Sequence, residues 1–124
     1  MRYTLLMHYP EVADELDPAI IEEAQRAFAS YTETLEAAGV LVSAEVLQPS
    51  TNTTTLRLED GALQVQDGPF ADTKDQLGGT LVLDVADLDA AIEWARQAPP
   101  LAWGAIEVRP GAVYTVAGAW TPNG

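Results

Sequence analysis

The sequence contains no cysteine, a single histidine, His8, and a single lysine, Lys74. Without cysteine there can be no disulfide bond, thiolate catalysis or zinc–thiolate site. One histidine cannot build a His-rich metal centre, and no loop has the ligand spacing of a carboxylate calcium site, so no metal or cofactor is expected. No apolar run reaches the roughly 18 residues of a membrane span, and the N-terminal residues do not resemble a signal peptide. We therefore expect a cytoplasmic protein.

Positive charge is scarce as well. The 124 residues include 19 Asp and Glu but only six Lys and Arg, which gives a formal net charge of −13. Such a surface repels phosphate, so neither nucleic acid nor an anionic membrane is an expected partner. The acidic residues form either a solubilising coat or a surface for a basic partner protein. The length and the 48% hydrophobic content are those of one globular domain over residues 1–124.

The residue pattern predicts a β-α-β unit, a hairpin, and a further β-α-β unit in one α+β domain. Strands are expected at residues 3–9, 40–47, 53–58, 62–66, 80–85, 105–109 and 113–117. Asp17-Pro18 begins a helix that ends at Gly39, and Asp87 begins a second helix that ends before Pro99. Two helices among this many strands favour a ferredoxin-like antiparallel sheet with both helices on one face.

The hairpin and the segment after it carry the most specific local signals. Asp60-Gly61 between alternating segments predicts a tight turn, with Leu56, Leu58, Leu63 and Val65 on a buried face. Residues 67–79 are expected to form an irregular loop, because they open with a turn signal and close with two glycines.

The sheet face away from the helices also needs cover, because Leu6 and Leu81, Leu83 or their neighbours make it apolar. A domain of this size has no further element to cover it. A second copy of the chain is the simplest cover, so we expect a homodimer formed face to face.

His8 is the candidate proton-transfer group, since an ordinary histidine titrates near neutral pH. Asp72 is the candidate that orients His8. Further candidate binding residues are Tyr9, Asp67, Phe70, Lys74 and Asp75, with Lys74 or Arg57 contacting an anion. Each has a structural alternative: His8 as a hydrogen-bonded residue of the dimer face, Lys74 in an ion pair with Asp72 or Asp75, and the aromatic residues in the core.

One stretch resembles a known family. Residues 67–79 read DGPFADTKDQLGG, and the segments 3–6, 37–42, 47–49 and 106–110 fit the same pattern. The chain resembles the DGPF-domain proteins, a branch of the YCII-related group, over residues 1 to about 110, whereas residues 111–124 depart from the usual pattern. The resemblance implies a dimeric α+β barrel, which is a ferredoxin-like fold that pairs through its sheets.

The resemblance leaves the function open. Members of the family are often encoded near, or fused to, extracytoplasmic-function sigma factors, which implies a regulatory partner. The wider group carries a His-Asp pair proposed as catalytic, with the histidine on the first helix, roughly where this chain has Phe28. Two functions are therefore carried forward. The first is binding or processing of a small molecule between the sheet and the 67–79 loop, and the second is a non-catalytic role as a partner of a sigma factor.

Overall fold

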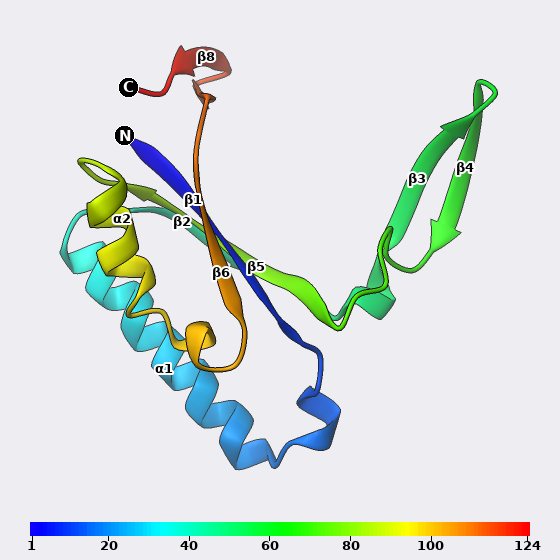
Figure 1. The fold of residues 1–124 in the computed structure, drawn as a ribbon, viewed down its shortest axis with the longest axis horizontal. Helices are drawn as coiled ribbons and strands as arrows, with labels where there is room; N and C mark the ends of the chain where they lie inside the picture. Colours follow the sequence, from blue (N-terminus) through cyan, green and yellow to red (C-terminus); the bar gives the residue numbers. More distant parts are fainter.

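The computed structural model describes all residues from 1 to 124 (Figure 1). Its elements, in chain order, are β1 (Arg2–Pro10), η1 (Ala13–Glu15), α1 (Pro18–Ala37), β2 (Leu41–Val46), η2 (Ser50–Asn52), β3 (Thr54–Glu59), β4 (Ala62–Asp67), β5 (Asp75–Asp84), α2 (Leu88–Ala95), η3 (Pro99–Ala102), β6 (Ala105–Pro110), β7 (Val113–Val116) and β8 (Ala119–Pro122).

Four of the strands form one antiparallel sheet in the order β2-β5-β1-β6. The central strands β1 and β5 pair along most of their length, from Arg2 opposite Asp84 to Pro10 opposite Asp75. This order and the two helices confirm the predicted α+β, ferredoxin-like class. The sheet is open, with β2 and β6 at its edges, and does not close into a barrel within one chain.

The helix ends follow the sequence signals. The Asp17 side chain accepts a hydrogen bond of 2.8 Å from the backbone nitrogen of Ala19, and Pro18 occupies the first helical turn. Asp87 caps α2 in the same way through the backbone nitrogen of Ala90. Neither α1 nor α2 combines the length and the apolar character that crossing a membrane would require.

The core lies between the sheet and the two helices. It comprises the inward residues of β1 and β5, two residues of α1, and the alanines of and after α2: Tyr3, Leu5, Met7, Tyr31, Leu35, Leu81, Leu83, Val85, Ala91, Ala95 and Ala98. Leu81 and Leu83 therefore face the helices, whereas the sheet face without helices carries Leu6 and Val82, both half-buried. In α2, Ala91 and Ala95 are buried, whereas Leu88 and Ile92 are exposed.

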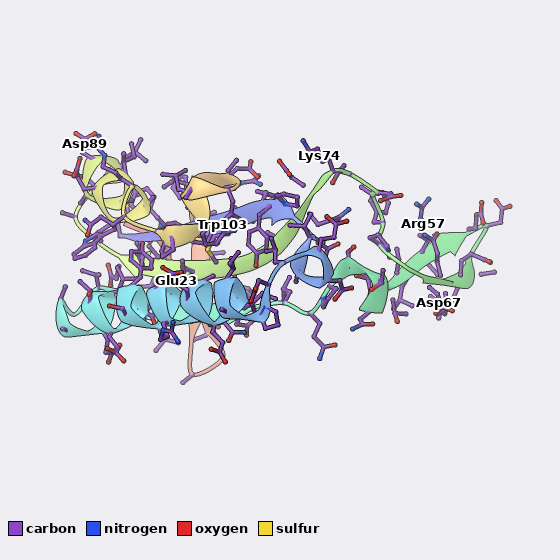
Figure 2. All side chains as sticks on the ribbon, turned by 90° about the horizontal axis from the view of Figure 1, so that it is seen from below. Glu23, Arg57, Asp67, Lys74, Asp89 and Trp103 are labelled. Carbon is purple, nitrogen blue, oxygen red and sulfur yellow. The ribbon has the colours of Figure 1, made fainter.

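The predicted hairpin forms, but its predicted burial is wrong. β3 and β4 pair around the turn Asp60-Gly61, where both residues have positive φ. This hairpin, Thr54–Asp67, is called the arm below, because both views show it projecting away from the helices and the four-stranded sheet (Figures 1 and 2). Its leucine and valine side chains are exposed because nothing in the chain lies over them.

The segment 67–79 is only partly irregular. β5 begins at Asp75, so the second half of the segment is the start of a central strand. The pairing of β1 with β5 slips between Met7 and His8, and Gly78 is the extra residue of this bulge. A Cβ at Gly78 would lie 2.1 Å from Cζ of Tyr9, so a side chain there requires the Tyr9 ring to move.

The C-terminal residues fold back on the start of β1. β7 and β8 form a second hairpin, of which only the first strand was predicted. The Asn123 side chain accepts from the Arg2 nitrogen at 2.7 Å and donates to the Arg2 and Gly111 carbonyls at 2.9 and 2.7 Å. The Arg2 guanidinium also stacks 3.8 Å from the centre of the Tyr114 ring.

Candidate functional site

A cavity of about 580 Å³ lies where the sheet ends and the arm begins. The end of β1, the start of β5, the β2–β3 connection and the β4–β5 loop surround it. Its lining residues are His8, Leu47, Gln48, Pro49, Ser50, Asn52, Thr53, Thr55, Pro69, Phe70, Ala71, Thr73, Asp75, Gln76 and Leu77. A cavity of this size is in the usual range for small-molecule sites. A second cavity, of about 340 Å³ between α2, η3 and β6, is lined almost entirely by apolar residues, with Arg96 as its charged side chain.

His8 lies in the wall of the larger cavity and has a carboxylate partner. Its Nε2 is 2.6 Å from Oε1 of Glu107 on β6. The pairing of β1 with β6 explains the contact, because Leu6 lies opposite Glu107 and His8 lies two residues further along the same face. The His8 side chain is 28% exposed and the Glu107 side chain is 66% exposed, so the pair is open to solvent and to a ligand.

The acidic residues of the segment 67–79 do not lie where the sequence-based hypothesis placed them, because Asp72 was expected beside His8. Asp72 is exposed and makes no hydrogen bond or ion pair with His8, whose carboxylate partner is Glu107. Asp75 lines the cavity, whereas Asp67 ends β4 on the arm. Lys74 lies on the outer side of the loop, apart from the arm (Figure 2), and no carboxylate lies within 4 Å of its ammonium group.

Hydrogen bonds to Thr53 and Thr55 hold the first half of the segment 67–79 in place. The Gly68 nitrogen donates to the Thr53 carbonyl at 2.8 Å, and the Thr55 hydroxyl donates to the Gly68 carbonyl at 2.8 Å. Gly68 has a φ of 104°, a conformation that favours glycine. The next side chains, Pro69 and Phe70, are thereby fixed on the cavity rim, where the Arg57 guanidinium lies 4.6 Å from the centre of the Phe70 ring.

The Gln76 side chain holds the second half of the segment 67–79 in place. Its side-chain nitrogen donates to the carbonyls of Ala71 and Thr73 at 3.0 and 3.1 Å. The Thr73 hydroxyl donates to the Asp75 carbonyl at 2.7 Å. The DGPF-like segment therefore builds an ordered cavity wall, and its glycine pair allows the close packing of Tyr9 and Met7 against β5.

The opposite wall depends on Glu11. Its carboxylate accepts a hydrogen bond of 2.6 Å from the Ser50 nitrogen and a second, short hydrogen bond from the Ser50 hydroxyl. This contact joins the end of β1 to η2 at the base of the arm. Tyr9 lies beside this wall, packed against Gly78, and does not line the cavity. Burial raises the pKa of the Tyr9 phenol, and the Glu11 charge raises the pKa further.

The arrangement offers proton transfer and hydrogen bonding. A proton on Nε2 of His8 is donated to Glu107, which leaves Nδ1 of the neutral ring as an acceptor. Hydroxyl and amide side chains supply the remaining donors and acceptors: Gln48, Ser50, Asn52, Thr53, Thr55, Thr73 and Gln76. No group of three His, Asp or Glu side chains is close enough together to hold a metal ion.

Sequence reasoning selected His8 as a candidate but did not select Glu107, which lies beside it. Glu107 is distant from His8 in the sequence, and its segment 106–110 was used for the family resemblance but not for the candidate site. The ferredoxin-like strand order could have indicated this contact, because it pairs β1 with β6 in an antiparallel register. Counting along that pair would have placed Glu107 near His8. Ser50 and Glu11 were also missed, because their contact joins two irregular connections.

Comparison with known proteins gives two findings. The model of the YCII-related domain matches residues 1–112. An uncharacterised protein of Rhizobium meliloti (strain 1021), R00369, is 46% identical over 80 residues, which are 62% of this chain and 64% of that relative. The match thus spans less than two thirds of the relative, and its name assigns no activity. The family model covers the four-stranded sheet, both helices and the candidate cavity, so the chain belongs to the YCII-related family.

Proposed function

We propose that the cavity beside His8 binds a small polar molecule, and that the His8–Glu107 pair hydrogen-bonds it or exchanges a proton with it. One observation carries the proposal. The only histidine of the chain lies in the wall of the larger cavity, with a carboxylate 2.6 Å from one ring nitrogen. A carboxylate in this position orients the imidazole by a hydrogen bond, as a general acid or base requires.

The lining residues indicate the class of ligand. Hydroxyl and amide groups alternate with Leu47, Phe70 and Leu77, so the site suits a molecule with both apolar and hydrogen-bonding surface. Asp75 and the neighbouring Glu107 are acidic, and no Lys or Arg lines the cavity. A neutral or cationic ligand is therefore favoured over an anion, and neither Lys74 nor Arg57 lines the cavity to contact one.

The test is equilibrium dialysis of the purified protein against a small-molecule extract of the cells that make it, followed by mass analysis of the retained compounds. The cavity-filling variant is Ala71→Trp, because Ala71 is an exposed residue of the cavity wall. The matched control is Ala29→Trp, which places the same side chain on an exposed position of α1.

We expect a compound that is enriched by wild-type protein and by Ala29→Trp but not by Ala71→Trp. His8→Ala should weaken retention of the same compound. Equal enrichment by all variants, or no enrichment by the wild type, would contradict the proposal. If the compound is converted during dialysis, turnover that survives His8→Ala removes His8 from the chemistry.

The acidic surface favours one alternative, a non-catalytic role as the partner of a basic protein such as a sigma factor. Nineteen carboxylates against six cations would attract such a partner over long range. A pull-down against a sigma factor encoded beside the gene tests this role at low salt. Retention that survives Ala71→Trp and His8→Ala would favour the alternative, because the cavity would then be irrelevant to the interaction.

A further inference from the structure

The smaller cavity lies on the helix side of the sheet. Its lining consists of five apolar side chains and one cation: Ile92, Ala95, Arg96, Leu101, Ile106 and Val108. Ile106 and Val108 of β6 lie opposite Met7 and Leu5, two core residues of β1, so they form the floor of the cavity. Its volume of about 340 Å³ is at the low end of the range for small-molecule sites.

The end of a short helix leaves this cavity open. α2 ends at Ala95, which is buried but has too short a side chain to fill the space over β6. Ile92 of α2 and Leu101 of η3 form the walls, and Figure 1 shows α2 and η3 on the same side of β6. The exposed fractions of these two side chains are 41% and 44%, so both reach the opening. The cavity is therefore apolar and accessible from solvent.

Arg96 gives this apolar cavity a single positive charge. No Asp or Glu side chain lines the cavity. The one carboxylate near the guanidinium is that of Glu93, at 3.6 Å, and the side chains of Arg96 and Glu93 are 70% and 63% exposed. An exposed pair of this kind contributes little to stability. The fork of N–H donors on the guanidinium can also serve a second carboxylate beside that of Glu93.

We propose that the smaller cavity binds a monocarboxylate with a small apolar body, such as a short-chain fatty acid. The apolar body lies on Ile106 and Val108, and the carboxylate accepts hydrogen bonds from Arg96. The net charge of −13 opposes an anion at long range, but the Debye length is only about 8 Å at physiological ionic strength, so the adjacent cation has the larger effect. The inference does not depend on the ligand proposed for the larger cavity.

The test is a two-dimensional ¹H–¹⁵N NMR titration of the whole chain with hexanoate, hexan-1-ol and hexylammonium, which share one apolar chain. Because Glu93 competes for Arg96, we expect hexanoate to bind with a millimolar dissociation constant and to shift the amides of α2, η3 and β6. Hexan-1-ol should bind more weakly, and hexylammonium most weakly. No shifts with hexanoate, shifts confined to the larger cavity, or equal affinity for hexanoate and hexylammonium would overturn the proposal.

Two substitutions test the charge. Arg96→Gln should raise the dissociation constant of hexanoate at least fivefold and that of hexan-1-ol less than twofold. Glu93→Gln should lower the dissociation constant of hexanoate, because the competing carboxylate is gone. The matched controls are Arg26→Gln and Glu22→Gln, which alter an equally exposed pair on α1 with a separation of 3.9 Å. Equal effects of Arg96→Gln and Arg26→Gln on hexanoate would overturn the proposal.

A third substitution tests the apolar part of the site. Ile92→Trp places a larger side chain at the opening and should weaken binding of hexanoate and of hexan-1-ol alike. Ile20→Trp is its control, because Ile20 is an exposed residue of α1 that lies outside the cavity. Unchanged binding in Ile92→Trp would place the probes elsewhere and overturn the proposal. The comparison of the three probes on wild-type protein decides the question even if a variant fails to fold.

Discussion

Gly78 is a residue at which an added side chain would meet a close neighbour. An added Cβ would lie 2.1 Å from Cζ and 2.4 Å from the hydroxyl oxygen of Tyr9, which packs on the bulge of β5. We predict that Gly78→Ala lowers the free energy of unfolding by about 1–3 kcal/mol, because Tyr9 must move from its place. Urea denaturation measures the loss.

Gly111→Ala is the matched control for this prediction. The Cβ of that variant would meet its nearest heavy atom, Nδ2 of Asn123, at 3.5 Å, which is an ordinary contact. Its free energy of unfolding should stay within about 0.5 kcal/mol of the wild type. Equal losses in the two variants would show that packing against Tyr9 is not the reason for glycine at position 78.

Tyr31 gives the fold a pH dependence in the alkaline range. Burial in the core raises the pKa of Tyr31 from the usual 10.0 to about 12, and its hydroxyl donates to the Trp94 carbonyl at 2.8 Å. The folded protein therefore holds this proton more tightly than the unfolded chain does. The resulting stability is present below pH 10 and is lost as the pH rises to about 12.

We predict that Tyr31→Phe lowers the free energy of unfolding at pH 7 by about 1 kcal/mol, because the Trp94 carbonyl loses its donor. The same variant should lose stability less steeply than the wild type above pH 10. Urea denaturation at pH 7 and at several alkaline values gives both quantities. An unchanged slope in the variant would contradict the assignment of the proton to Tyr31.

The roles of some residues could be predicted from the sequence, whereas the roles of others could not. Asp17 and Asp87 as helix caps, and Asp60-Gly61 as a turn, follow from local hydrogen bonding and φ preferences, which a short segment determines. The partner of His8 does not follow from a short segment. Glu107 reaches His8 only after β1 and β6 pair, so local rules could not select it over Asp72.

At the scale of elements, the hairpin of β7 and β8 is the clearest addition to the four-stranded sheet and its two helices. Asn123 makes three side-chain hydrogen bonds to Arg2 and Gly111, at 2.7–2.9 Å. We predict that Asn123→Ala releases the hairpin, so that the amides of β7 and β8 exchange faster while the core of the sheet stays protected. Hydrogen exchange with mass analysis measures this change.

Asn52→Ala is the control for that experiment. The Asn52 side chain donates to the exposed side chain of Gln48 and has no role at the C-terminus. The Asn52→Ala variant should leave hydrogen exchange of the β7 and β8 amides unchanged. If Asn123→Ala also leaves it unchanged, the side chain of Asn123 does not hold the hairpin in place.

The elements themselves were largely predictable, and the exceptions have physical causes. β8 was missed because its turn uses Ala117, at a φ of 48°, before Gly118, and alanine is not a typical residue for that conformation. The start of β5 was expected to be a loop, because Gly78 and Gly79 suggest a turn. Both glycines instead allow close packing inside the sheet, against Tyr9 and Met7.

At the scale of the whole molecule, the arm shows why alternation of side chains does not establish burial. The period of two correctly divides its residues into an apolar and a polar face. The period of two does not identify the surface that packs on the apolar face of the arm. A single chain leaves that face exposed. In the homodimer that we expect from the sequence, a second copy would be available to cover it.

The net charge predicts how that association depends on salt. Each copy carries a formal charge of −13, so two copies repel at low ionic strength. Raising the salt from about 0.01 M to about 1 M shortens the Debye length from about 30 Å to about 3 Å. We predict that the dimer dissociation constant falls across this range, as measured by sedimentation equilibrium. A rise would indicate association through opposite charges instead.

One native mass spectrum of wild-type protein, purified gently from its own cells, tests the central claim most directly, because it reports bound ligand and subunit number together. The account predicts a species of two chains, each of 13.3 kDa, that carries an additional small mass. Collisional activation should release that mass before the subunits unfold. A bare single chain of 13.3 kDa at micromolar concentration would contradict both the proposed ligand in the cavity beside His8 and the homodimer expected from the sequence.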